Sequence, residues 1–422
     1  MATAPASPAT RSRRRNLVRS PGAALVAGGA CLGLVAAAVA TAYPESSPLV
    51  PEHAAPDGGW AWAYLVFAAA AFAAYVGGLL ALGRLRESRL GAVLVVAFGV
   101  QLAPLAGPVL LSTDVYTYWD YGRIAAVHDG NPYVDRPSEF PDDPAFPLMG
   151  AQWRDTTSVY GPGFSLASEA HASAVGDSPD LAAWIYKALA ALAMLALTVL
   201  AARLGRRPAY AAAFVGWNPL LALHFAGGGH NDAWMMAFVL LALVAGAGGR
   251  RALAGVAWAV AVAVKWLPLV FIPLRYLEAR RAGKPVNHYA FPATLGLVAG
   301  VASLVYGGAW LGAFGPLREN LVEERADYSM PSRLSGLGMP EGAAVALLAA
   351  LFVVVYAWLL REAWRGRARL ALTAGLLLVA TSWLVPWYAV WAVPLAAVEE
   401  DAPARWLALA LSAYLLRDAV PL

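Results

Sequence analysis

Residues 90–122 read LGAVLVVAFGVQLAPLAGPVLLSTDVYTYWDYG, and this stretch decides the fold class of the chain. Its first part, roughly 90–111, is an apolar run of ~20 residues, the length that spans ~30 Å of hydrocarbon. Its second part opens with Asp114 and is rich in aromatic residues. An acidic residue at the point where a membrane helix emerges into water, followed by a groove-forming helix, suits chemistry on a lipid-anchored substrate.

Apolar runs of similar length recur along the chain, which is 60% hydrophobic and only 14% charged. This composition predicts an all-α, polytopic transmembrane helical bundle with about 11–13 crossings. The single Cys31 excludes an internal disulfide and a cysteine metal cluster. The net charge of +4 comes from arginines in short loops, which is typical of orientation signals and not of nucleic-acid binding.

The charges of the loops predict the orientation of the chain in the plasma membrane. Arginines precede the apolar residues 22–42, so we expect a basic cytoplasmic tail at 1–21 and a retained signal anchor after it. The rest, 22–422, is then a single transmembrane domain. Alternation of loop charge places the long loops 112–178 and 312–340 outside the cytoplasm, and the length of the first favours a functional loop.

The apolar stretch 252–277 lies between two basic loops that both belong in the cytoplasm. Two short helices meeting near Lys265 and Pro268 would satisfy this requirement, and a single helix is the alternative. Broken helices at membrane depth are tolerated only where they line a buried or water-filled cavity. An ionisable residue such as Lys265 at this depth indicates a functional site, with snorkelling to an interface as the alternative.

A helix over about 114–128 would place Asp114, Tyr118 and Tyr121 on one face, since residues three and four apart are neighbours. We expect this amphipathic helix to lie along the membrane surface, with Asp114 as a general base. Asp114 also suits the position of a helix cap, and the two roles are compatible. Asp120 is the alternative base.

The remainder of the first outer loop contains two turns, at 129–133 and at 159–163, recognised by their Gly and Pro residues. Tyr160 lies in the second turn. The loop is also acidic, which could suit a divalent ion with oxygen ligands, but we favour a solvated surface. The acidic residues in question are Asp135, Glu139, Asp142, Asp143 and Asp155.

Residues 217–234, WNPLLALHFAGGGHNDAW, bring a glycine triplet and then His230, Asn231 and Asp232 to the outer end of an apolar run. No third ligand accompanies His230 and Asp232, which argues against zinc. A glycine-rich turn at a helix start beside a histidine suits an anion such as a phosphate. A turn capped by Asn231 or Asp232 is the alternative.

The second outer loop combines arginines with acidic residues. Its arginines either grip a phosphate or pair with the neighbouring carboxylates, and the sequence does not choose between these readings. The residues are Arg318, Arg325 and Arg333, among Glu319, Glu323, Glu324 and Asp327.

Taken in order, these motifs resemble those of the GT-C glycosyltransferases over roughly residues 90–400. The resemblance is greatest to the bacterial polyprenyl-phosphomannose-dependent α-mannosyltransferases and to glycosyltransferase family 87. The motifs are STDVYTY at 112–118, GNPY at 130–133, VYGP at 159–162, NP at 218–219, GHND at 229–232, Lys265 followed by Pro268, and PWYAVW at 386–391.

This resemblance implies a membrane enzyme that takes a hexose, in the first place mannose, from a polyprenyl-phosphate donor. The acceptor would be a glycolipid or polysaccharide of the cell envelope outside the cytoplasm. The resemblance also implies that the acidic residue at the start of the first outer loop, here Asp114, is the base.

Physical chemistry agrees with that mechanism, because a phosphate-linked sugar already has a good leaving group. The enzyme then needs a base for the acceptor hydroxyl and cations for the departing phosphate, and direct displacement inverts the anomeric carbon. No cofactor is required in principle, although a divalent cation is compatible, and no nucleotide-binding motif is present. Asp114 is the expected base, and the expected substrate-binding residues are Tyr118, Asp120, Tyr121, Tyr160, His230, Asn231, Asp232, Lys265, Arg318 and Arg325.

The rival hypothesis is a lipid or glycan transporter in which Lys265 and Asp232 line a pathway and the outer loop is a lid. The absence of two matching halves in the sequence counts against it. A transporter moves its substrate unchanged, whereas a transferase makes a glycosidic bond. A non-catalytic scaffold would explain neither Asp114 nor Lys265.

Overall fold

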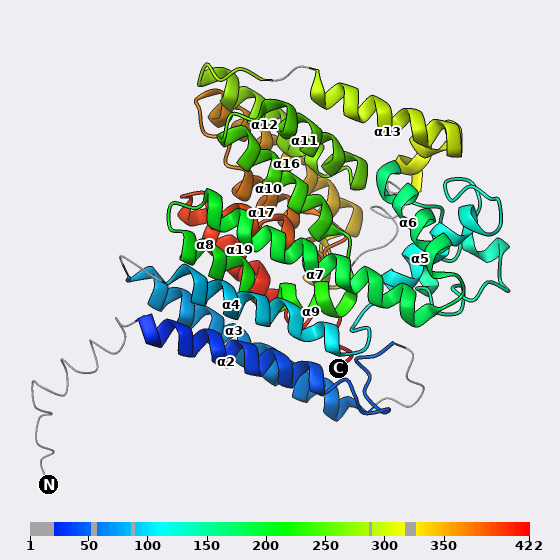
Figure 1. Cartoon of the computed structure of the whole chain (residues 1–422), viewed down its shortest axis with the longest axis horizontal. Helices are drawn as coiled ribbons and strands as arrows, with labels where there is room; N and C mark the ends of the chain where they lie inside the picture. The colour runs from blue at the N-terminus through cyan, green and yellow to red at the C-terminus, as the bar shows by residue number, and fades with distance from the viewer. Residues whose placement is uncertain (1–20, 52–56, 86–88, 287–288, 317–325) are drawn as a thin grey trace, which may run out of the picture.

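The computed structural model describes residues 21–51, 57–85, 89–286, 289–316 and 326–422. Within these ranges the chain forms helices and no strand, which confirms the predicted all-α bundle (Figure 1). The predicted cytoplasmic tail falls almost wholly outside them.

The first half of the chain contains α2 (Pro21–Ala40), α3 (Gly58–Gly83), α4 (Leu90–Leu102), η1 (Ala103–Ala106), α5 (Asp114–Ala126), η2 (Pro137–Glu139), η3 (Ala151–Trp153), α6 (Pro162–Val175), α7 (Pro179–Leu204), α8 (Pro208–Gly216) and α9 (Pro219–Gly228). The second half contains α10 (Asp232–Ala247), α11 (Arg251–Val264), α12 (Pro268–Arg281), α13 (Ala290–Tyr306), η4 (Ala309–Ala313), α15 (Met330–Gly336), α16 (Glu341–Trp364), α17 (Leu370–Ala380), η5 (Pro386–Trp391), α18 (Val393–Val398) and α19 (Ala402–Tyr414).

Four of the described helices are long and apolar enough to cross a bilayer, namely α2, α3, α7 and α16. Two bent pairs raise this number to six: α9 with α10, bent by 119°, and α13 with the segment Ala309–Pro316, bent by 102°. Apolar helices of 10–17 residues pack beside them, among them α11 and α17. The chain is therefore a polytopic helical bundle, while the predicted number of crossings and the predicted orientation stay predictions.

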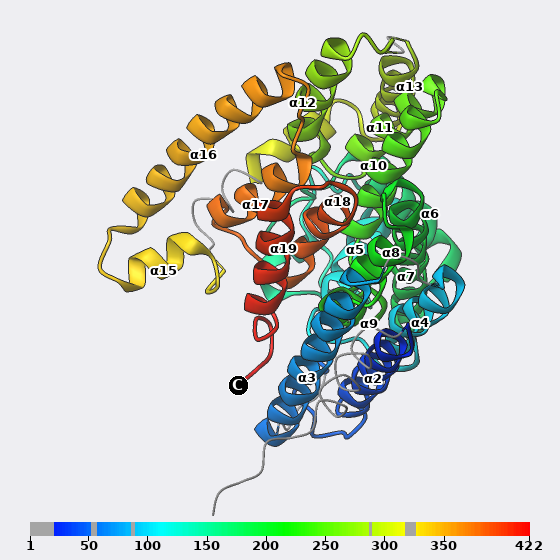
Figure 2. The same cartoon turned by 90° about the vertical axis from the view of Figure 1, so that its left-hand side faces the viewer.

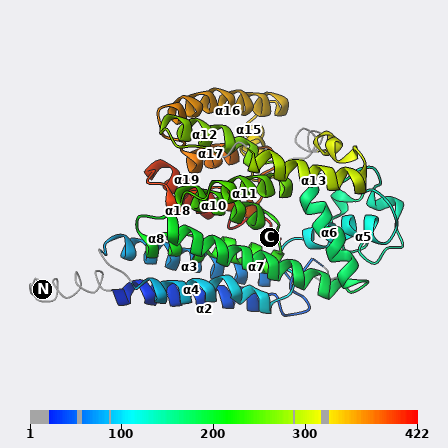
Figure 3. The same ribbon diagram turned by 45° about the horizontal axis from the view of Figure 1, so that its top comes forward.

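The long helices lie side by side in successive layers (Figure 1, Figure 3). The contacts run from α2 and α4 at one edge through α7 to α10 and α11, and α12 packs on α16 at the other edge. Figure 2 shows α15 and α16 to one side of the bundle. The short helices α5 and α6 gather at one end of α7, so this end carries the first long loop.

Prolines mark many of the helix starts. Each of α6, α7, α8, α9 and α12 has a proline in its first turn, where the missing N–H is not needed by the helix. Between α11 and α12, Lys265 is extended and Pro268 begins the new helix. The stretch 252–277 therefore forms two helices, the first of the two alternatives.

Helix α5 is enclosed by protein on every face, since residues 115–124 are all buried. The position of α5 along the membrane surface stays a prediction, but the helix has no face open to water. Helices α6 and α7 cover part of it and the connection after α5 folds over the rest, where Tyr121 donates a hydrogen bond to the Thr156 carbonyl (2.7 Å). A side chain at Gly122 would lie 2.2 Å from the Ser168 carbonyl oxygen, so this close contact of α5 with α6 requires glycine.

Candidate functional site

The bend between α9 and α10 carries residues 229–232 into the middle of the bundle. Gly229 ends α9 in the left-handed conformation, with φ of 73°. A Cβ there would lie 2.3 Å from Val115 Cγ1, so glycine meets both the backbone and the packing requirement. This close approach brings His230 beside Asp114, which lies 116 residues earlier in the chain.

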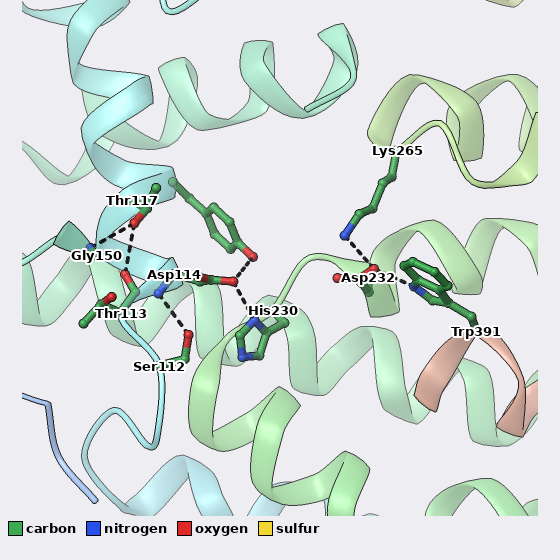
Figure 4. Close-up of polar contacts among 10 residues, drawn as sticks. Ser112, Thr113, Asp114, Thr117, Gly150, His230, Asp232, Lys265 and Trp391 are labelled. Carbon is green, nitrogen blue, oxygen red and sulfur yellow. Dashed lines mark hydrogen bonds and ion pairs between the residues drawn. The ribbon is translucent and has the colours of Figure 1, made fainter. Parts of the chain in front are cut away.

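Asp114 is the partly exposed carboxylate of the site, with 15% of its side chain accessible. Its Oδ2 accepts a hydrogen bond from the Tyr118 hydroxyl (3.2 Å) and pairs with His230 Nδ1 (3.1 Å), as Figure 4 shows. The predicted capping role is wrong, because Thr113 holds the cap position and the Asp114 carboxylate faces these two partners. The backbone N–H of Asp114 instead donates to Ser112 Oγ (3.2 Å).

His230 is fully buried, and its ring stacks on Trp387 with a centroid separation of 3.6 Å. Its Nε2 atom has no hydrogen-bond partner among the described residues. A substrate entering the site therefore meets Asp114 before His230. Because His230 is buried, its role is to position the Asp114 carboxylate. Direct contact of His230 with an anion stays a prediction.

Asp232 and Lys265 form a second pair at the other end of the bend. Lys265 Nζ donates to Asp232 Oδ1 (2.7 Å), and Trp391 Nε1 donates to the same oxygen (2.6 Å). Asp232 is fully buried, whereas the Lys265 side chain is 19% exposed. Neither Asn231 nor Asp232 makes a capping hydrogen bond to α10, so the capping alternative is wrong, and Lys265 pairs with a buried acid.

The turn at 159–163 holds Tyr160 between these two pairs. The Gly161 N–H donates to the Val264 carbonyl at the end of α11 (3.3 Å), one residue before Lys265. The Tyr160 ring meets Tyr118 edge to face, with centroids 5.2 Å apart. The first outer loop and the α11–α12 break are thus joined at the site.

Tyr118 and Tyr160 lie close enough to both acids to feel their charge. Burial raises the pKa of each phenol well above its usual value, and Asp114 and Asp232 raise it further. Both phenols are therefore protonated at neutral pH. Neither phenol can act as a base. The Tyr118 hydroxyl already donates its one hydrogen to Asp114, so of the two it is Tyr160 that can donate to a substrate.

We call Asp114, Tyr118, His230, Asp232 and Lys265 the bend site. Asp120 lies outside it, because six residues along a helix turn the side chain by about 240°. Burial, and then the charge of Asp143, raise the pKa of Asp120 to about 7. Asp120 is enclosed, so nothing in the geometry supports its expected role as an alternative base or a substrate contact.

Asp120 instead adjoins a set of ion pairs around the buried Arg123 and Asp143. Arg123 Nε lies 2.8 Å from Asp143 Oδ1, and Arg123 Nη2 lies 2.8 Å from Asp177 Oδ1. His128 Nε2 is 2.7 Å from Asp143 Oδ2. We call the four paired residues, Arg123, His128, Asp143 and Asp177, the closed cluster. The predicted solvated surface is therefore wrong for Asp143, which the guanidinium holds inside the loop, while Glu139, Asp142 and Asp155 are exposed.

The predicted arginine contacts of the second outer loop are only partly described. Arg318 and Arg325 lie outside the described residues, as do their three glutamate neighbours. Arg333 donates a hydrogen bond to the Tyr414 hydroxyl (2.9 Å) and lies over the Tyr328 ring. Among the described residues, no three His, Cys, Asp or Glu side chains are arranged to hold a metal, and independence from a metal stays a prediction.

Three residues of the site were missed as site residues in the sequence. Trp387 and Trp391 contact His230 and Asp232, and the aromatic motif at 386–391 was the available signal. Lys187 donates to the carbonyls of Gly107 and Pro108, which precede Asp114 by a few residues. A lysine within an apolar helix was its signal, of the same kind as for Lys265.

Comparison with known proteins places the chain in a family. Residues 23–279 match the family model described as alpha-(1->6)-mannopyranosyltransferase, N-terminal domain. The match includes Asp114, His230, Asp232 and Lys265, but not the aromatic motif that contacts them. No solved structure matches the chain.

Relatives from three organisms have names of the same kind. Alpha-(1->6)-mannopyranosyltransferase A of Mycobacterium tuberculosis is 32% identical over 220 residues, covering 48% of this chain and 41% of that protein. The protein of that name from Corynebacterium glutamicum is 32% identical over 170 residues, covering 39% and 34%. A probable alpha-(1->6)-mannopyranosyltransferase of Mycolicibacterium smegmatis is 27% identical over 360 residues, covering 69% and 62%.

The chain thus spans less than half the length of the first two of these relatives. The family match itself covers more than half of the chain and contains all five residues of the bend site. The chain therefore belongs to the family of the alpha-(1->6)-mannopyranosyltransferase N-terminal domain.

Proposed function

We propose that this protein transfers a mannosyl residue from a polyprenyl-phosphate donor to a hydroxyl group of an envelope glycolipid or polysaccharide. The reaction takes place in the plasma membrane, on its extracytoplasmic side, with the N-terminus in the cytoplasm. Family membership supports mannosyl transfer. The observation that carries the mechanism is the partly exposed Asp114 carboxylate, held by Tyr118 and His230 across the bend from the Lys265 ammonium.

Asp114 is the general base of this mechanism. Both of its side-chain contacts use Oδ2, and Oδ1 makes no hydrogen bond with any described residue. Oδ1 is therefore available to the hydroxyl hydrogen of the acceptor. It accepts that proton as the acceptor oxygen attacks the anomeric carbon, a contribution typically worth about 10²–10⁴ in rate.

Lys265 is the cation that faces the departing phosphate. The bond from the anomeric carbon to the phosphate oxygen breaks as the new glycosidic bond forms, and its electron pair remains on the phosphate. One N–H of Lys265 is committed to Asp232, while an ammonium has three donors and this one is 19% exposed. A polyprenyl phosphate carries less charge than a nucleotide diphosphate, so a single cation suits it.

The single base also sets the stereochemistry. Among the described residues, the second carboxylate of the bend site, Asp232, is buried and paired with Lys265, so it is not placed as a nucleophile. The acceptor then displaces the phosphate directly and inverts the anomeric carbon. The relatives are named for α-(1→6) bonds. Inversion to an α bond requires a β-linked donor, and the name of the relatives points to a primary 6-hydroxyl group as the acceptor.

Unpaired polar atoms at the bend support a carbohydrate ligand. Both amide atoms of Asn231, Oδ2 of Asp232 and Nε1 of Trp234 are buried and have no partner among the described residues. Leaving such a group unpaired costs about 1–3 kcal/mol. The hydroxyl groups of a bound sugar, or water in its absence, can supply the missing hydrogen bonds when the site admits them.

The proposal is tested with the full chain in lipid vesicles. Radiolabelled mannose is supplied either as polyprenyl-phosphate mannose or as a nucleotide-diphosphate mannose, and transfer to membrane glycolipids is measured for the wild type and Asp114→Asn. We expect transfer from the lipid donor by the wild type only. Equal transfer by both proteins would show that Asp114 is not the base.

Two other outcomes would overturn the reaction itself. Transfer from the nucleotide donor alone would refute the lipid donor. Movement of intact polyprenyl-phosphate mannose across the vesicle membrane, with no new glycosidic bond, would identify a transporter.

A further inference from the structure

A cavity of about 410 Å³ lies at the end of the bundle remote from the bend site. Its walls come from α3, from the connection between α7 and α8, and from the start of α19. Helix α7 joins the two ends, and its 26 residues make it about 39 Å long. The cavity and the first outer loop are therefore separated by roughly the thickness of a bilayer.

One wall of this cavity is apolar, and the cavity opens beside it to the side of the bundle. This wall is formed by Val76, Leu79 and Leu80 of α3 and by Trp406 and Leu409 of α19. Two of these side chains face outward, since Leu80 is 52% exposed and Trp406 is 66% exposed. Because α3 is long and apolar enough to cross a membrane, we expect this opening to face the lipid chains.

The rim of the cavity is basic. Four arginines line it, Arg84, Arg206, Arg207 and Arg405, against one acidic residue, Glu400. Arg206 pairs with Glu400 at 2.7 Å, with both side chains more than half exposed. The rim as a whole keeps a net charge of three positive units.

Two of these arginines are held in place by backbone carbonyls. Arg207 donates to the carbonyls of Leu82, Gly83 and Leu85 at the end of α3, with distances of 2.8–3.1 Å. Arg405 donates to the carbonyl of Ala396 (3.1 Å). Since carbonyls are neutral, these contacts position the guanidinium groups without cancelling their charge.

We propose that this cavity binds an anionic phospholipid of the bilayer, with its phosphate at the arginine rim and its acyl chains along α3 and α19. Guanidinium groups match phosphate oxygens in geometry as well as in charge. Basic pockets between membrane helices suit such headgroups. A free phosphate would leave the apolar wall uncovered. The bound lipid would join three segments that are far apart in the sequence, independently of the proposed reaction.

The test uses native mass spectrometry of the purified full chain in detergent, with phosphatidylglycerol and phosphatidylcholine of identical acyl chains. We expect phosphatidylglycerol to bind about tenfold more tightly than phosphatidylcholine. The attraction of three cations for an anionic headgroup is large enough to produce a tenfold difference in affinity. The variant Arg84→Gln/Arg206→Gln/Arg405→Gln should lose this preference. Arg207 is retained because it holds the end of α3.

The matched control removes the same charge elsewhere. Arg280→Gln/Arg281→Gln/Arg361→Gln changes three exposed arginines that do not line the cavity, and it should keep the preference. A second variant, Ala402→Trp, keeps every arginine but narrows the cavity, and it should weaken the binding of phosphatidylglycerol. It also decides the matter if the triple variant does not fold.

Five results would overturn the proposal. The first is equal binding of the two lipids, and the second is equal loss in the control variant. The third is unchanged binding by Ala402→Trp. The fourth is displacement of the lipid by millimolar inorganic phosphate, which would show a site for the free anion. The fifth is preferential binding of polyprenyl phosphate over phosphatidylglycerol.

Discussion

Helix α5 separates two charged clusters that differ in how completely their groups are paired. In the closed cluster, the Arg123 and Asp143 side chains are 4% and 3% exposed and meet at 2.8 Å. Asp143 also pairs with His128, and Arg123 with Asp177. In the bend site, Asp114 is partly exposed and its Oδ1 makes no hydrogen bond with the described residues.

This difference separates structural charges from functional ones. Burying a charge is tolerable when its partners are in place, and the closed cluster meets that condition. The bend site keeps unpaired atoms on His230 and Asp232, as does the adjacent Asn231, which weakens the folded state unless a ligand or water binds them. We therefore expect changes in the bend site to reduce transfer, with a loss of stability as well where they break the buried Asp232–Lys265 pair, and changes in the closed cluster to reduce stability alone.

The largest expected effect is that of Asp114→Asn. Transfer of mannose should fall by about 10²–10⁴-fold, because the amide cannot accept the proton of the acceptor. The thermal unfolding midpoint should change little, since Tyr118 and His230 can still contact the amide. Transfer and the thermal unfolding midpoint are both measured on purified protein. A loss of transfer in proportion to a loss of folded protein would contradict the distinction between the two clusters.

The second-largest effect is expected for Lys265→Met. This change leaves the fully buried Asp232 with Trp391 but without its cation. Removal of one partner from a buried pair costs about 3–5 kcal/mol in the free energy of unfolding. The double variant Lys265→Met/Asp232→Asn should recover part of that stability without recovering transfer. Denaturant unfolding and the transfer assay test this, and a double variant no more stable than the single one would contradict it.

A smaller loss is expected for Asp143→Asn, about 3 kcal/mol in the free energy of unfolding. Arg123 would lose one carboxylate but would keep Asp177 and the Gly176 carbonyl. Transfer per folded molecule should remain within about twofold of the wild type, a change of less than 0.5 kcal/mol. The neighbouring Asp142→Asn, an exposed change, is the control and should alter neither quantity. A loss of transfer per folded molecule without a loss of stability would contradict the distinction between the two clusters.

The smallest effect concerns the pH dependence of stability due to Asp120. Its pKa is raised from 3.8 to about 7 in the folded protein, so the folded state keeps a proton that the unfolded state loses as the pH rises. Stability from this group is complete below pH ~4 and is lost up to about pH 7.

Asp120→Asn should therefore unfold at a temperature that exceeds the wild-type value increasingly as the pH rises from 5 to about 8. Thermal unfolding at several pH values measures this, with the exposed Asp155→Asn as the control. A difference that shrinks with rising pH would show that Asp120 is ionised and paired.

Much of the fold followed from local physical chemistry in the sequence. Apolar runs must form helices in a bilayer, and proline and glycine mark where those helices begin and end. The break at Lys265 and Pro268 was one of two alternatives that the charge of the flanking loops left open. The enclosure of α5 was not predicted, because it depends on how the distant residues 129–163 fold over it.

The sequence by itself determined the helical membrane class and singled out Asp114 and Lys265, because an ionisable residue beside apolar runs is costly and calls for a reason. Only the tertiary structure decided their partners. Asp114 meets His230 across 116 residues, and Asp232 meets Trp391 across 159. Such pairs depend on how helices pack and bend in space, and no periodicity along the chain encodes that geometry.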